Sequence, residues 1–217
     1  MGAILMSLIP KLRGLRVAGV FAAAALATAC ATPAQKSATA DTEYLLTVSR
    51  PGLLHVIDMK TDRIARSCEL PGKFGSGALV PAPDGRHAFV LGNLWEDVYG
   101  FELDTCKLVF SARQSEGDVT VKTVQSLAVS ADGSELYTVQ NPVRRGADRF
   151  EVLPPRLAVY RIADGLDAKP VRSFPVKRRI TKIAATAGGE VILGGADVEA
   201  IDVRSGAVRT VSALAPK

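Results

Sequence analysis

Three segments of the chain repeat one pattern, in which an apolar run enters a tight turn containing glycine and a second apolar run follows. The segments are VPAPDGRHAFVLG (80–92), VSADGSELYTV (129–139) and ATAGGEVILGG (185–195). Apolar runs on both sides of an Asp-Gly or Gly-Gly turn are typical of β-hairpins. Because the same hairpin recurs along the chain, the sequence predicts a repeated structural unit.

A second element follows each hairpin: an alternating strand that ends near an aspartate, a short turn, and another strand. These copies span 98–112, 157–174 and 198–214, and a first unit without the glycine hairpin spans 44–70. The unit is therefore four short strands in about 40–50 residues, which is typical of a β-propeller blade. We expect an all-β fold over residues 43–217, with about four blades of a larger propeller arranged as an open arc.

The turn aspartates and the two histidines are expected to be structural. Asp and Gly favour tight turns through local backbone geometry, so Asp58, Asp84, Asp104 and Asp132 are predicted to shape the hairpins. His55 and His87 lie within strands and are expected to be hydrogen-bonded strand residues. The sequence contains no GxSxG, HExxH, P-loop or CxxCH motif. We therefore expect no catalytic, cofactor-binding or metal-binding residue on this chain.

The first 29 residues have the features of an export signal. Lys11, Arg13 and Arg16 precede an uncharged apolar run at 17–29 that is too short for a confident membrane span. Residues 30–42 are small and polar and are expected to form a flexible tether. The signal holds three of the 27 basic residues and none of the 22 acidic ones, so the exported chain has a net charge of only +2. This charge and the absence of a basic stripe give no support to nucleic-acid binding.

Cleavage of the signal leaves two alternatives open. Ala27-Thr28-Ala29-Cys30 resembles a bacterial lipoprotein box, in which the cysteine is acylated and becomes the mature N-terminus. In that case Cys30 would carry a lipid anchor, which is the only membrane attachment we expect. Ordinary cleavage after Ala29 or Ala31 also satisfies the rule of small residues.

Cys68 and Cys106 are the other two cysteines. They could pair in an oxidising compartment, but they lie far apart in the sequence and nothing else in the sequence brings them together. We expect two separate buried thiols.

The repeat is interrupted in two places. NPVRRGADRFEVLPP (141–155) is a long insertion with three arginines and a phenylalanine, which are residue types enriched at interfaces. It is predicted to be either an interaction loop or an ordinary exposed loop with solvated charges. The second interruption, GNLWEDVYGF (92–101), contains Trp95, the only tryptophan. We expect Trp95 to fill a gap in the core.

Several stretches resemble one protein family. They are Pro142-Val143-Arg144, the run Phe150-Glu151-Val152 with Pro154 and Arg156, the segment Arg178-Arg179-Ile180-Thr181, and the opening EYLLTVSRPGLLHVID. Together they resemble the β subunit of quinohaemoprotein amine dehydrogenase over most of residues 43–214. The family's β chain is much longer, so the resemblance covers only its first half.

The resemblance implies a seven-bladed propeller within a periplasmic complex that oxidises primary amines. In that family the γ subunit carries cysteine tryptophylquinone, the α subunit carries c-type haems, and the β subunit is a non-catalytic scaffold that helps to wall the active-site cavity. This chain would accordingly carry no cofactor and would bind α and γ subunits. We expect 142–156 to face the partner, with the candidate interface residues Pro142, Arg144, Phe150, Glu151, Pro154 and Arg156. Arg144 and Arg156 would form charge-assisted bonds to it, and Phe150 would be the apolar anchor.

A different class of function is the alternative hypothesis. The lipobox-like segment and the tether at 30–42 are compatible with a stand-alone propeller lipoprotein that is tethered to a surface and binds protein or peptidoglycan. The FEVLPPR run argues against this alternative, since a generic propeller needs no such insertion.

Overall fold

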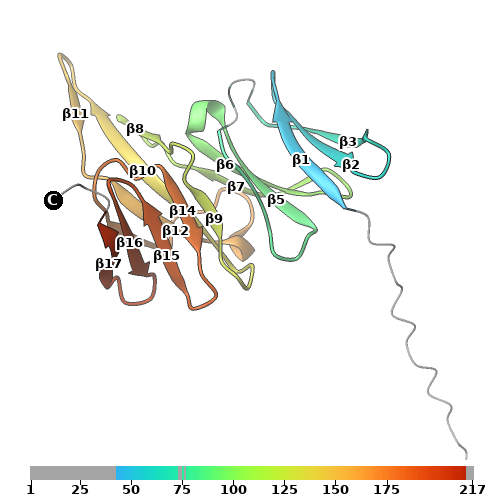
Figure 1. Cartoon of the computed structure of the whole chain (residues 1–217). Coiled ribbons are helices and arrows are strands. Elements are labelled where there is room, and N and C mark those ends of the chain that lie inside the picture. The colour runs from blue at the N-terminus through green and yellow to red at the C-terminus, as the bar shows by residue number, and fades with distance from the viewer. Residues whose placement is uncertain (1–42, 73–74, 76, 214–217) are drawn as a thin grey trace, which may run out of the picture. The chain divides into compact units, whose positions relative to one another are not determined.

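The computed structural model describes residues 43–213 except 73–74 and 76, and this part of the chain consists mainly of short strands (Figure 1). The strands form four antiparallel sheets, none of which closes on itself within the described residues. The all-β prediction is confirmed, and the arrangement is consistent with a β-propeller-like fold. The expected signal (1–29), the tether (30–42) and Cys30 lie outside the described residues.

Three of the four sheets are meanders of consecutive strands, as the repeat predicted. The first sheet contains β1 (Tyr44–Ser49), β2 (Leu53–Asp58) and β3 (Arg63–Glu69). The second contains β4 (Leu79–Pro81), β5 (His87–Gly92), β6 (Asp97–Glu102) and β7 (Lys107–Arg113), with the short 3-10 turn η1 (Asn93–Trp95) between β5 and β6. The fourth contains β14 (Lys182–Ala185), β15 (Glu190–Gly194), β16 (Asp197–Asp202) and β17 (Val208–Ala213).

The third sheet is larger than a four-stranded unit. Its regular strands are β9 (Leu127–Val129), β10 (Glu135–Arg145), β12 (Arg156–Arg161) and β13 (Arg172–Pro175), with η2 (Ile162–Asp164) after β12. Two further strands, β8 (Val119–Lys122) and β11 (Phe150–Val152), pair with the second half of β10. The segment expected to be a loop at 141–155 is therefore largely β-structure.

The hairpin turns form as the sequence predicted. Gly85, Gly133 and Gly189 have φ angles of +66°, +74° and +83°, which favour glycine. Asp84 Oδ1 accepts hydrogen bonds from the backbone N–H groups of the two residues that follow the turn, at 2.8 and 3.1 Å. At Asp132, hydrogen bonds from the hydroxyl of Ser130 and from the neighbouring residue 134 lower the pKa to about 2. The structural role expected for Asp84 and Asp132 is confirmed.

Both histidines are also hydrogen-bonded within the strand framework. The imidazole of His55 lies 2.7 Å from the hydroxyl of Ser49 and 2.8 Å from that of Ser67, on the two neighbouring strands. His87 Nδ1 lies 2.6 Å from the carboxylate of Asp84.

Apolar side chains fill the space between consecutive sheets. One cluster joins the first and second sheets, a second joins the second and third, and a third joins the third and fourth. Alternation within a strand divides its residues between two clusters: Phe89 and Leu91 pack toward the third sheet, whereas Ala88 and Val90 pack toward the first. This burial of both faces explains why the central strands are continuous apolar runs.

Gly100 in β6 is required by the close approach of two phenylalanines. A Cβ atom at this position would lie 2.7 Å from Phe89 Cε1 and 2.8 Å from Phe110 Cβ. The rings of Phe89 and Phe110 meet edge to face, with centroids 5.7 Å apart.

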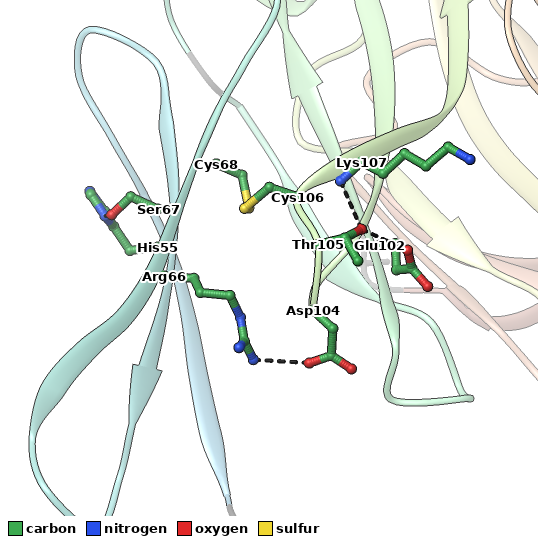
Figure 2. The surroundings of a disulfide bond; sticks show 9 residues. All are labelled: His55, Arg66, Ser67, Cys68, Glu102, Asp104, Thr105, Cys106 and Lys107. Carbon is green, nitrogen blue, oxygen red and sulfur yellow. Dashed lines mark hydrogen bonds and ion pairs between the residues drawn. A yellow bond between two sulfur atoms is a disulfide. The ribbon is translucent and has the colours of Figure 1, made fainter.

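The prediction of two separate thiols is wrong, because Cys68 and Cys106 form a disulfide (Figure 2). Packing of the first sheet on the second places the two Cα atoms 5.1 Å apart despite a sequence separation of 38 residues. A second link lies beside it: Arg66 Nη2 donates a hydrogen bond to Asp104 Oδ1 at 2.9 Å (Figure 2). The first sheet is therefore fixed to the second by a covalent bond and an ion pair as well as by apolar contacts.

Substitution Gly100→Ala tests the close packing in the second sheet. The added methyl group would force apart two buried aromatic rings, so we expect a loss of about 1–3 kcal/mol in the free energy of unfolding, measured with urea. Gly188→Ala is the matched control, because the nearest atom to a Cβ there is 3.8 Å away. Equal stability of the two variants would contradict this account of Gly100.

Reduction of the Cys68–Cys106 disulfide tests its contribution to stability. A cross-link that closes a loop of this size stabilises a fold by about 3–4 kcal/mol. We expect a reducing agent to lower the urea midpoint of the native chain by a corresponding amount. The double variant Cys68→Ala, Cys106→Ala should already have the lower midpoint, and the reducing agent should leave it unchanged. A midpoint that does not respond to reduction in the native chain would show that the bridge adds no stability.

Candidate functional site

The long strand β10 pairs with different strands along its two halves and so carries the interrupted part of the repeat. Its first half pairs with β9 and β12 inside the third sheet. Its second half, from Asn141 to Arg145, continues beyond this sheet and pairs with β8 on one side and β11 on the other. A three-stranded extension, β8-β10-β11, therefore projects from the regular sheet.

The six candidate interface residues lie on or beside this extension. Pro142 and Arg144 are in β10, Phe150 and Glu151 are in β11, Pro154 is in the connection to β12, and Arg156 begins β12. Strand alternation divides them between two faces. Arg144 lies opposite Glu151 in the register, and Arg145 lies opposite Phe150.

One face of the extension exposes apolar side chains. Phe150 is 71% exposed and Val152, two residues further along β11, is 59% exposed. Since both point to the same side of β11, they form a small apolar pair that the described residues leave uncovered. Exposed aromatic side chains of this kind are suited to an interface.

Arg144 of the extension forms ion pairs within the chain. Arg144 Nη1 donates to Glu151 Oε2 at 3.0 Å, and Arg144 Nε lies 3.6 Å from Asp118 Oδ2. The sequence had suggested that Arg144 would bond to a partner. In the structure its charge is already balanced by these two exposed carboxylates.

A cavity of about 450 Å³ lies on the other face of the extension. Four candidate residues line it: Pro142, Arg144, Pro154 and Arg156. The remaining lining residues are Gln114, Glu116, Val119, Val121 and Leu153. Four of the residues predicted to form a subunit interface thus line one side of this cavity, and the segment after β7 and strand β8 contribute residues that the sequence analysis did not single out.

A buried network of polar side chains adjoins the cavity. Arg156 Nε donates to Gln140 Oε1 at 2.7 Å, and Gln140 Nε2 donates to Tyr160 Oη at 2.7 Å and to Gln114 Oε1 at 3.1 Å. Burial raises the pKa of Tyr160 to about 12. A signal for Gln140 was present in LYTVQ, because it shares its strand face with the buried Leu136 and Thr138.

One buried donor of this network is unpaired. Gln114 is 7% exposed, and its Nε2 has no hydrogen-bond partner among the residues that the structure describes. An unsatisfied buried donor costs about 1–3 kcal/mol. This unpaired donor belongs to a side chain that lines the cavity.

Trp95 is not a core residue, contrary to the prediction. It is 41% exposed. Asn93, Leu94 and Trp95 all have positive φ angles, and this left-handed turn takes the indole out of the strand pattern. The ring lies over Gly77, where a Cβ atom would come within 2.4 Å of Trp95 Cδ1.

Metal-binding clusters and membrane-spanning helices are both absent from the described part of the chain. It contains no group of three or more His, Cys, Asp or Glu side chains arranged to hold a metal ion. It also contains no helix that is long and apolar enough to cross a membrane.

Comparison with known proteins supports the fold alone. The chain is similar to a solved structure described as the crystal structure of a functionally unknown protein from Desulfotomaculum acetoxidans DSM 771, with a TM-score of 0.55 and 14% sequence identity. The match covers 78% of this chain and 50% of that one, so this chain spans about half the length of that structure. No family model matches the chain. No curated protein matches it either.

Proposed function

We propose that this chain is a non-catalytic β-propeller scaffold subunit of an exported, periplasmic amine dehydrogenase of the quinohaemoprotein type. In this proposal its four sheets are blades of a seven-bladed propeller. The γ subunit of the complex would carry cysteine tryptophylquinone and the α subunit the c-type haems. The role of this chain would be to position the γ subunit and to help to exclude water from the active-site cavity.

The observation that carries the proposal is the form taken by the FEVLPPR run. This run, which supports the resemblance to the family, forms β11 and the entry to β12, and it presents Phe150 and Val152 to solvent. A rigid strand pair with outward apolar side chains is a suitable docking element, since little conformational freedom is lost on binding. The disulfide between Cys68 and Cys106 adds support for export, because structural disulfides persist in oxidising compartments.

Purification from the native host tests the assignment. A mild affinity preparation of the full chain should contain two partner subunits and show the Soret band of haem in its visible spectrum. A colourless preparation of this chain alone would contradict the proposal. In that case the mass of Cys30 with or without lipid would decide whether the chain is a tethered lipoprotein.

Substitution of the apolar pair tests the docking element. We expect Phe150→Ala combined with Val152→Ala to leave the stability within about 0.5 kcal/mol of the native value, because exposed side chains contribute little to folding. The same double variant should lose at least about tenfold in the yield of co-purified subunits, as expected for removal of an aromatic anchor. Leu166→Ala is the matched control: Leu166 is 57% exposed but lies in the connection between β12 and β13. An equal loss of co-purified subunits for the control and for the double variant would overturn the docking role of the β10-β11 hairpin.

A further inference from the structure

We propose that the cavity beside the β8-β10-β11 extension binds the carboxylate of a ligand whose adjoining part is apolar. Three features carry the proposal: the direction of the buried hydrogen bonds, an arginine without an ion pair, and the apolar walls.

The direction of the hydrogen bonds is fixed by Arg156. A guanidinium can only donate, so Gln140 must present its oxygen to Arg156 Nε, at 2.7 Å. The amide nitrogen of Gln140 then faces Gln114, which must present its own oxygen, at 3.1 Å. That oxygen also accepts hydrogen bonds from the hydroxyls of Thr123 and Thr138, at 2.9 and 3.2 Å.

The orientation of Gln114 leaves its amide nitrogen without a partner. The hydroxyls of Thr123 and Thr138 can donate or accept, but Gln140 Nε2 can only donate, so this bond alone holds the oxygen of Gln114 in place. Gln114 lines the cavity, and its Nε2 has no partner within the described ranges. Next to the cavity, Gln114 therefore has a buried N–H donor with no acceptor among the described residues.

The charge of the cavity is set by Arg156. Arg144 is balanced by Glu151 and Asp118, whereas Arg156 has no ion pair with any described residue and uses only its Nε in the network. Its terminal nitrogens can still donate. Glu116, which is exposed and also lines the cavity, opposes an anion there. The two terminal nitrogens of one unbalanced guanidinium suit a single carboxylate, which accepts N–H donors in pairs.

The apolar side chains that line the cavity determine which chemical group of the ligand adjoins the carboxylate. Val119, Val121, Pro142, Leu153 and Pro154 supply apolar surface, and the volume of about 450 Å³ is in the range of small-ligand sites. Such a ligand could be a free apolar acid, or the C-terminal residue of a polypeptide with an apolar side chain. Both offer the same chemistry. The exposed Phe150 and Val152 lie on the opposite face of β11, so this site and the docking surface are separate.

Binding to the exported full chain, measured by calorimetry, tests the proposal. The probes are 3-phenylpropionate for a free acid and N-acetyl-Ala-Leu with a free carboxylate for a chain end, each compared with its own carboxamide. We expect at least one carboxylate to bind at least about tenfold more tightly than its carboxamide, because a charge-assisted bond is lost in the amide. Tighter binding of 3-phenylpropionate would identify a free acid as the ligand type. Tighter binding of N-acetyl-Ala-Leu would identify the C-terminal end of a polypeptide.

Three variants separate the site from general stability. Arg156→Met should weaken the preferred carboxylate by at least about tenfold. Glu116→Gln, an exposed change that cannot unfold the core, should strengthen it about twofold or more, as expected when a like charge at a rim is removed. Arg149→Met is the control, because Arg149 is exposed at the hairpin and does not line the cavity. Its affinity should equal that of the native chain.

Two outcomes would overturn the proposal. One is the absence of binding by both carboxylates at up to about 10 mM, which is about tenfold above the Kd of about 1 mM expected of a weak specific site. The other is equal affinity for carboxylate and carboxamide, with no response to Glu116→Gln. The isolated chain is sufficient for this experiment. Failure here therefore leaves the amine dehydrogenase proposal standing, and failure of subunit co-purification leaves this site standing.

Discussion

Burial of both faces of the inner sheets is the constraint on which the rest of the structure depends. A single four-stranded sheet in water would expose one apolar face, so each sheet needs a neighbour. The second sheet satisfies this requirement by dividing β5 between two clusters, with Phe89 on one side and Val90 on the other. Once the sheets are packed in this order, the positions of the disulfide and of the polar network follow from it.

Strand β10 links the regular packing to the irregular part of the molecule. Its inner half belongs to the buried third sheet, and its outer half supports β8 and β11. Because one continuous strand carries both halves, the extension is oriented by the core and does not behave as a separate loop. The same strand places Gln140 at the point where the core ends, and there it connects Arg156 with Gln114.

The two faces of the extension have different chemistry, and the proposals use them differently. The face with Phe150 and Val152 is apolar and open, which suits contact with another subunit. The opposite face borders a cavity that is lined by Arg156, which has no ion pair with a described residue, and by the buried Gln114. Pairing the hydrogen-bonding groups of a ligand with groups already held in place costs little reorganisation, which is why a preorganised donor set favours specific recognition.

The local pattern of the sequence was sufficient for the repeat, the strands, the turns at Gly85, Gly133 and Gly189, and the structural role of the turn aspartates. These features depend on backbone geometry and on alternation between neighbours in the chain. The local pattern did not predict the disulfide between Cys68 and Cys106, the exposure of Trp95, or the proximity of Gln114 to Arg156. Each of these depends on which sheet faces which, and on where a left-handed turn directs a side chain. Such contacts join residues distant in the sequence, and only the packed tertiary structure decides them.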